Sequence, residues 1–171
     1  MRIVAGKFAG RHLTPPADSR VRPTAESVRA GMLDLLAPDL AKARVLDLFA
    51  GTGALGLEAL SRGARYADFV EFRPSSLHAL KANVAALRLL KCTRIFKKDV
   101  VPFVSMLQPE AYDIAFVDPP YESQVLELVL GAWRERRFAR ILAVEHARDH
   151  RLPKGSQQQM FPECAVTIYR L

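Results

Sequence analysis

The chain has 171 residues, of which 50% are hydrophobic, 25% are charged and two are cysteine. This length predicts one domain, and a chain of this size buries roughly 70% of its unfolded surface without cross-links. The composition excludes an intrinsically disordered chain and a disulfide-stabilised scaffold, and no run approaches the ~20 apolar residues of a membrane-spanning helix. The first residues lack the apolar core of a signal peptide, so the expected location is cytoplasmic.

The charge balance is basic. The formal net charge is +7, and 18 of the 25 basic residues are arginine. Arginine offers a planar fork for phosphate groups and a flat face for stacking on bases, so the balance favours a nucleic acid as partner. Four of the seven net positive charges lie within residues 1–31. A GC-rich genome would also enrich arginine, and the cluster over 134–140 is interpreted as the solvated face of a helix.

Residues 1–31 are predicted to form a basic arm, and residues 32–171 are predicted to form the main domain. Within the arm, Arg2–Val4 and Arg11–Leu13 are predicted as the two strands of a short hairpin, because the glycines between them permit a tight reversal.

A proline-rich linker over 14–22 follows, and Thr24 is a suitable N-cap for the next helix. From residue 44 onward, apolar strands alternate with helical patterns. Strands are predicted at 44–49, 66–71, 94–99, 112–117 and 141–147, helices over 54–62, from 74 onward, over 100–107 and over 124–133, and a closing hairpin at 158–161 and 165–171. Such alternation is typical of an α/β fold with a parallel sheet and helices on both faces.

The first of these strands runs into a glycine-rich loop, Gly51-Thr52-Gly53-Ala54-Leu55-Gly56, that precedes a helix. This G-x-G-x-x-G pattern fits a dinucleotide, with Glu71 binding ribose hydroxyls 20 residues after Gly51. Asp47 argues against that cofactor, because a carboxylate beside the loop would repel a pyrophosphate. S-adenosylmethionine carries a sulfonium and an ammonium group instead, so an acid at the loop suits it.

Asp99 stands at the end of the third predicted strand and is a candidate acceptor for an adenine amino group. Asp47, Glu71 and Asp99 then stand at the ends of three successive strands, which meet at one rim of a parallel sheet. A structural role remains an alternative for Asp47 and for Asp99, because aspartate is also a frequent loop and helix-capping residue. The pattern predicts a pocket for S-adenosylmethionine.

The fourth predicted strand ends in Asp118-Pro119-Pro120-Tyr121. Two consecutive prolines remove two N–H donors, so this loop presents carbonyl oxygens and one carboxylate. These groups suit a planar amino group conjugated to a ring: Asp118 and the Pro119 carbonyl would accept its two hydrogen bonds, and Tyr121 would stack on the base. A rigid turn with an incidental aromatic residue is the structural alternative.

Together these motifs resemble the bacterial 16S rRNA (guanine-N2)-methyltransferases of the RsmD type. The resemblance covers nearly the whole chain: the opening RIVAGKFAGRHL, the segment Arg22-Pro23-Thr24, the run DLFAGTGALGLEALSRGA and the tetrapeptide in FVDPPY. It departs at Glu26-Ser27, where the family usually has an Asp-Arg pair, and at Phe72-Arg73, where the family often has another acid.

The resemblance implies a Rossmann-like class I methyltransferase fold, with a mostly parallel seven-stranded sheet and an antiparallel last strand. It implies methyl transfer from S-adenosylmethionine to the exocyclic N2 amine of a guanine in 16S rRNA. The expected catalytic residues are Asp118, Pro119, Pro120 and Tyr121. The expected cofactor-binding residues are Asp47, Phe49, Gly51, Gly53, Glu71, Phe72, Asp99 and Val100. The expected RNA contacts are Arg2, Lys7, Arg11, Arg22 and Thr24.

The expected partner is 16S rRNA within a small-subunit assembly particle, and the protein is expected to be a monomer without membrane contact or a bound metal. Adenine-N6 or cytosine-N4 methylation of a nucleic acid is an alternative, since the same tetrapeptide chemistry serves those amines. A non-catalytic RNA-binding assembly factor of the same fold is a second alternative. Binding of S-adenosylmethionine discriminates between an enzyme and that assembly factor.

Overall fold

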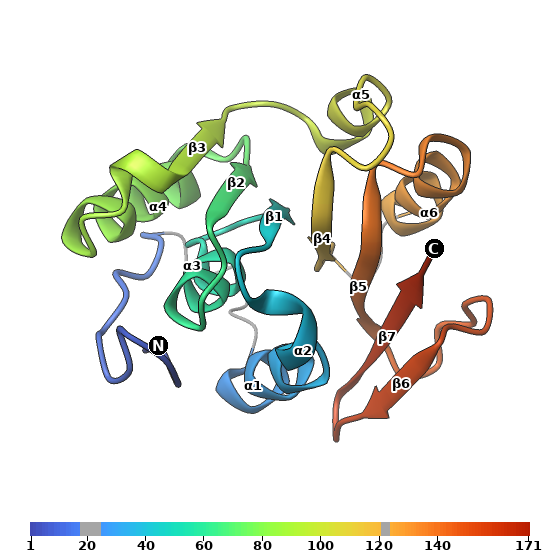
Figure 1. Ribbon diagram of the computed structural model, residues 1–171, viewed down its shortest axis with the longest axis horizontal. Coiled ribbons are helices and arrows are strands. Elements are labelled where there is room, and N and C mark those ends of the chain that lie inside the picture. Colours follow the sequence, from blue (N-terminus) through green and yellow to red (C-terminus); the bar gives the residue numbers. More distant parts are fainter. Residues whose placement is uncertain (18–24, 121–123) are drawn as a thin grey trace.

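The computed structural model describes residues 1–17, 25–120 and 124–171 (Figure 1). The strands are β1 (Arg44–Leu48), β2 (Tyr66–Val70), β3 (Thr93–Phe96), β4 (Tyr112–Val117), β5 (Ala139–Ala147), β6 (Gln157–Met160) and β7 (Cys164–Arg170). The α-helices are α1 (Glu26–Leu35), α2 (Ala37–Leu40), α3 (Ala54–Ser61), α4 (Pro74–Ala86), α5 (Val100–Val104) and α6 (Val125–Arg136), and a 3-10 turn, η1, spans Leu90–Cys92.

The seven strands form one sheet in the order β3-β2-β1-β4-β5-β7-β6. The pairs from β3 through β5 are parallel, whereas β7 is antiparallel to both β5 and β6. This confirms the predicted α/β fold with an antiparallel last strand. The strand order reverses between β1 and β4, and in open α/β sheets ligands bind beyond the carboxyl ends of the strands at such a point.

Helices cover both faces of the sheet because neighbouring strand residues point to opposite sides. Val45 belongs to a buried cluster that contains apolar residues of α1, α3 and α4. Leu46, the next residue, belongs to a second cluster that contains apolar residues of α5 and α6. Figure 1 shows α5 and α6 on one side of the sheet and α1, α3 and α4 on the other.

The predicted N-terminal hairpin is present, but it is shorter than two three-residue strands. Arg2 and His12 form one antiparallel bridge, the Ile3 amide donates to the Arg11 carbonyl at 2.9 Å, and the Leu13 amide donates to the Met1 carbonyl at 3.1 Å. Beyond Ile3, the Val4 and Ala5 amides donate to the carboxylate of Glu58 on α3, at 2.8 Å each, and the ladder does not continue. The arm is therefore docked on α3.

Other boundaries differ by one to three residues. The first strand ends at Leu48 because Phe49 adopts a positive φ of 62°. Helix α5 ends at Val104 rather than residue 107. The predicted N-cap Thr24 lies outside the described residues, and Ala25 occupies the N-cap position of α1. The predicted boundary between 31 and 32 falls inside that helix.

Candidate active site

The glycine loop connects β1 to α3 through three residues with positive φ. Phe49, Gly51 and Gly53 have φ values of 62°, 55° and 81°, a region that L-residues other than glycine rarely adopt. Gly53 is the N-cap of α3, and a Cβ atom there would lie 2.4 Å from a methyl carbon of Leu80. Gly53 therefore lets the loop adopt this conformation close to Leu80. It is not among the described residues that line the cavity.

Asp47 is buried at the end of β1, with 2% of its surface exposed. Its Oδ2 accepts a hydrogen bond of 2.9 Å from the Gly56 amide. Burial raises the pKa of Asp47 well above its ordinary value, and the charges of Asp118 and Glu71 act in the same direction. A cationic group beside Asp47 would favour its ionised form.

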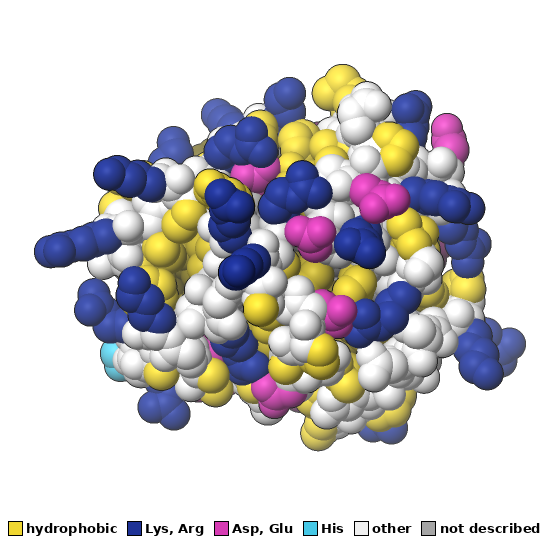
Figure 2. All heavy atoms as spheres, in the orientation of Figure 1, with side chains coloured by type: hydrophobic (Ala, Val, Ile, Leu, Met, Phe, Trp, Pro, Cys, Tyr) yellow, Lys and Arg dark blue, Asp and Glu magenta, His cyan; other side chains and the backbone are white. Residues whose placement is uncertain are grey.

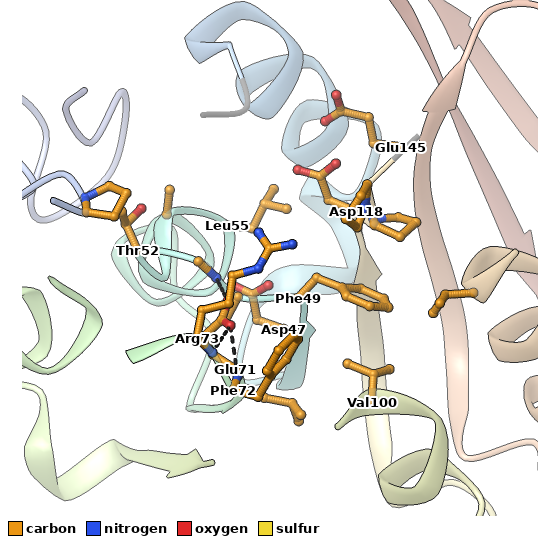
Figure 3. A pocket seen from close by; sticks show the side chains of 18 of the residues that line it. Asp47, Phe49, Thr52, Leu55, Glu71, Phe72, Arg73, Val100, Asp118 and Glu145 are labelled. Atoms are coloured by element: carbon orange, nitrogen blue, oxygen red, sulfur yellow. Dashed lines mark hydrogen bonds between the residues drawn. The ribbon is translucent and has the colours of Figure 1, made fainter. Parts of the chain in front are cut away.

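Glu71 at the end of β2 ties two loops together. Its Oε2 accepts from the Gly51 amide at 2.9 Å, and its Oε1 accepts from the Phe72 and Arg73 amides at 2.8 Å each. Figure 3 shows these bonds converging on the carboxylate. A carboxylate has about four lone-pair positions, so these three bonds leave one on Oε2 for a ligand hydroxyl.

Asp99 has the structural role that aspartate often takes at this position. It is the N-cap of α5, and its Oδ1 accepts from the Val101 amide at 3.0 Å. It also lines the cavity together with Val100 and Phe72. The Phe72 side chain is half-exposed and offers a flat apolar surface in the lining of the cavity.

Asp118, Pro119 and Pro120 follow β4 and line the same cavity, whereas Tyr121 lies outside the described residues. The register pairs Val117 of β4 with Val144 of β5, so the next residues, Asp118 and Glu145, are neighbours at the sheet edge. Figure 3 shows both carboxylates close together above Phe49.

The cavity has a volume of about 540 Å³, within the range of about 300–1,000 Å³ that is usual for small-molecule sites. It brings together these predicted residues: Asp47, Phe49, Gly51, Glu71, Phe72, Asp99, Val100, Asp118, Pro119 and Pro120. Sequence reasoning assigned no binding role to several of the residues that line the cavity: Met1, Thr52, Leu55, Arg73, Glu145 and Glu163. Glu145 could have been found, since it stands near the end of the strand beside β4.

A family model described as "Conserved hypothetical protein 95" matches residues 1–161. Two relatives bear the name Ribosomal RNA small subunit methyltransferase D. The Haemophilus influenzae protein is 31% identical over 181 residues, which cover 100% of this chain and 92% of the relative. The Escherichia coli (strain K12) protein is 38% identical over 127 residues, which cover 74% of this chain and 63% of the relative. The chain belongs to the RsmD-type family.

Solved structures agree with this membership. The Escherichia coli protein yhhF superposes with a TM-score of 0.86 at 30% identity, covering 99% of this chain and 97% of that one. The Haemophilus influenzae protein HI0767 superposes with a TM-score of 0.82 at 25% identity, covering 99% and 97%. With the sheet order, these likenesses establish the Rossmann-like class I methyltransferase fold.

In this RsmD-type chain, the predicted RNA contacts of the arm lie apart from the cavity lining. Arg2 forms an exposed ion pair with Glu26 at 3.4 Å, and the Arg11 guanidinium donates to the Ala86 carbonyl at 3.4 Å. Lys7 lies over the ring of Phe8. The predicted contacts Arg22 and Thr24 fall outside the described residues.

Within the described ranges, no group of His, Cys, Asp or Glu side chains is arranged to hold a metal ion. Nor is any helix of those ranges long and apolar enough to cross a bilayer. Cys92 and Cys164, both within the described ranges, are not joined in a disulfide.

Proposed function

We propose that this protein is an rRNA methyltransferase that uses S-adenosylmethionine to methylate the exocyclic N2 amine of a guanine in 16S rRNA. The observation that carries the proposal is the convergence in one cavity of Asp118-Pro119-Pro120 with Asp47, Glu71 and Asp99. The names of the relatives support rRNA as the substrate class. We further propose that residues 1–31 bind RNA and residues 32–171 carry the reaction, in a cytoplasmic monomer.

The residues of the cavity fit the chemistry of this cofactor. Asp47 is a buried carboxylate whose ionised form gains from a nearby cation, and the cofactor supplies a sulfonium methyl group for transfer and an ammonium group. Glu71 keeps one lone-pair position for a ribose hydroxyl, and Asp99 keeps an oxygen that the Val101 bond does not use. Phe72 presents an aromatic face to an adenine ring.

Asp118 and the prolines would act on the substrate amine. The lone pair of a guanine N2 amine is delocalised into the ring, so the nitrogen is a poor nucleophile. Hydrogen bonds from its two N–H groups to the Asp118 carboxylate and the Pro119 carbonyl would orient the nitrogen and stabilise the positive charge that develops on it. The acceleration then comes mainly from positioning and electrostatics. Tyr121 would hold the base by stacking.

The direct test incubates the protein with labelled S-adenosylmethionine and small ribosomal subunits that lack their methylations, alongside naked rRNA and duplex DNA. We expect N2-methylguanosine from subunit rRNA after digestion, and the naked RNA reports whether assembly is needed. Label on adenine or cytosine would contradict the proposed base. Cofactor binding without transfer to any substrate would favour the non-catalytic assembly factor.

A matched pair of variants tests the role of the tetrapeptide. Asp118→Ala should lower turnover by at least about 100-fold, while the dissociation constant of the cofactor changes little. The control is Asp113→Ala at the opposite end of β4, where the carboxylate accepts from the Arg44 amide at 2.7 Å, remote from the cavity lining. Near-normal turnover of Asp118→Ala would refute the assigned role.

A further inference from the structure

Positive charge is concentrated in two segments of the chain. Residues 72–98 contain seven lysine or arginine residues and no aspartate or glutamate. Residues 1–17 contain three lysine or arginine residues and likewise no acidic residue. In the remaining sequence, acidic residues outnumber basic ones by 18 to 15. The net charge of +7 is therefore supplied entirely by these two segments.

The two segments are in contact. The Asn83 side chain of α4 accepts from the Thr14 amide at 2.7 Å and donates to the Thr14 carbonyl at 3.1 Å. One turn further along α4, the Ala86 carbonyl accepts from the Arg11 guanidinium. Phe8 of the arm and Leu89 beyond α4 pack against the same core cluster. The arm and α4 therefore form one continuous surface.

We call the exposed Lys and Arg side chains of residues 7–11 and 73–98 the basic face. In Figure 2, dark-blue side chains lie along the side where Figure 1 places α4, β3 and the N-terminus, with little magenta among them, whereas the dark-blue side chains toward the opposite edge lie closer to magenta ones.

The charges of the basic face are mostly unneutralised. Arg94 pairs with Asp68 at 2.6 Å, and it is the one residue of this face that forms an ion pair within the described ranges. The other basic cluster, over 134–140, differs in this respect: Arg136 lies 3.7 Å from Glu135, and Arg140 lies 3.9 Å from Glu110. Like charges that are gathered without internal partners repel one another, so an external anion would stabilise the basic face.

The basic face reaches the cavity through Arg73. This is the one Lys or Arg among the described residues that line the cavity, and Figure 3 shows its side chain extending toward the cavity interior. Arg73 is also the N-cap residue of α4 without a side-chain capping bond, where a cation is unfavourable beside the helix dipole. From Arg73, α4 extends about 20 Å to the arm, since a helix rises about 1.5 Å per residue.

We infer that the phosphate backbone of the substrate RNA lies along the basic face, with Arg88 and Lys91 at its far end as phosphate contacts. This rests on the proposed function, because the cavity at the near end is where the target base would enter. An RNA strand suits a band of unpaired cations that leads to a nucleotide-sized cavity better than a planar lipid surface does. The RNA surface thus extends from the arm onto α4 and η1.

The test compares two variants that remove the same charge. Arg88→Ala/Lys91→Ala removes two cations of the basic face, and Arg136→Ala/Arg140→Ala is the matched control. Binding of small-subunit rRNA to the full chain is measured between 50 and 200 mM salt, and thermal unfolding checks that each variant folds. Each lost contact reduces the salt slope by about 0.7–0.9. We therefore expect the slope to fall by about 1.6 for Arg88→Ala/Lys91→Ala. Between 50 and 200 mM salt, the factor by which this variant loses affinity should then be roughly tenfold smaller than the factor for the wild type.

A wild-type slope for Arg88→Ala/Lys91→Ala, or an equal loss in the control variant, would overturn the inference. Tight binding of the wild type to anionic phospholipid vesicles, lost in the same variant while RNA binding is kept, would assign the basic face to a lipid surface and also overturn it. Failure of the proposed function is recognised separately, because the wild-type protein itself would then not methylate rRNA, whatever the salt dependence of its RNA binding.

Discussion

Glu58 is completely buried on α3, the helix that follows the glycine loop, and it holds the N-terminal arm in place. Its Oε2 accepts from the Val4 amide and lies 3.4 Å from the Arg29 Nε, and Arg29 is also fully buried. Its Oε1 accepts from the Ala5 amide and lies 3.3 Å from the Arg62 Nε. Replacing Glu58 with alanine would leave two amides without their acceptor and a buried guanidinium without its counter-charge.

The cost of Glu58→Ala follows from these contacts. Removing one partner of a buried ion pair costs about 3–5 kcal/mol, because the remaining charge stays buried and uncompensated. The two amides regain water only if the arm detaches, so we expect the arm to be released from α3. For a domain of this size, each kcal/mol lowers the melting temperature by about 2–4 °C. Glu58→Ala should therefore melt at least about 6 °C below the wild type.

Urea unfolding measures this change, and hydrogen exchange at Val4 and Ala5 measures release of the arm. The control is Glu135→Ala, which removes an exposed carboxylate that lies 3.7 Å from Arg136 on the surface of α6 and should change stability by less than about 0.5 kcal/mol. If Glu58→Ala lost less than about 1 kcal/mol while its arm amides stayed protected, the reasoning about this buried charge would be wrong.

Two further predictions concern Gly53 in the glycine loop and Asp47 in the strand before it. Gly53→Ala should destabilise the protein by about 2–3 kcal/mol in urea unfolding, because alanine is strained at positive φ and its Cβ would collide with Leu80. The control is Gly131→Ala in α6, where no atom lies within 4 Å of the added Cβ, and it should be neutral or stabilising in the same assay. The raised pKa of Asp47 means that the native state binds this proton more tightly than the unfolded state, so the contribution of Asp47 to stability falls as pH rises from its ordinary pKa toward its native one. Asp47→Asn should therefore be more stable than the cofactor-free wild type at neutral pH and lose that advantage in acid. It should also bind S-adenosylmethionine less well. If the variant were less stable than the wild type at neutral pH, the reasoning about the raised pKa of Asp47 would be wrong.

The sheet and most of the cavity could be predicted because their signals are local. Each acid of the pocket stands at or near the carboxyl end of a strand, and parallel strands bring these ends to one edge. The pattern could not decide between two roles for Asp99, since the same spacing suits a ligand contact and a helix cap. The structure contains the cap, and the contact with the adenine remains a prediction.

What escaped prediction depends on contacts between distant segments. Arg29 looks like one more surface charge in a basic arm, yet it is buried against Glu58, 29 residues away. Glu163 lies between β6 and β7 and reaches the cavity because β7 returns antiparallel beside β5. The acid-free run over 72–98 is visible in the sequence, but its contact with the arm is not.

The cavity draws its lining from almost the whole length of the chain. Met1 lies at one end of the lining set and Cys164 at the other, and the Met1 sulfur is 3.7 Å from the Thr52 hydroxyl. During synthesis, the residues of β1, α3 and the glycine loop leave the ribosome long before Glu163 does. Domains generally fold as units during translation, and contacts between distant residues form slowly. The complete cavity would therefore form only when β7 has joined the sheet, so that partly synthesised chains lack the site that the proposed reaction needs.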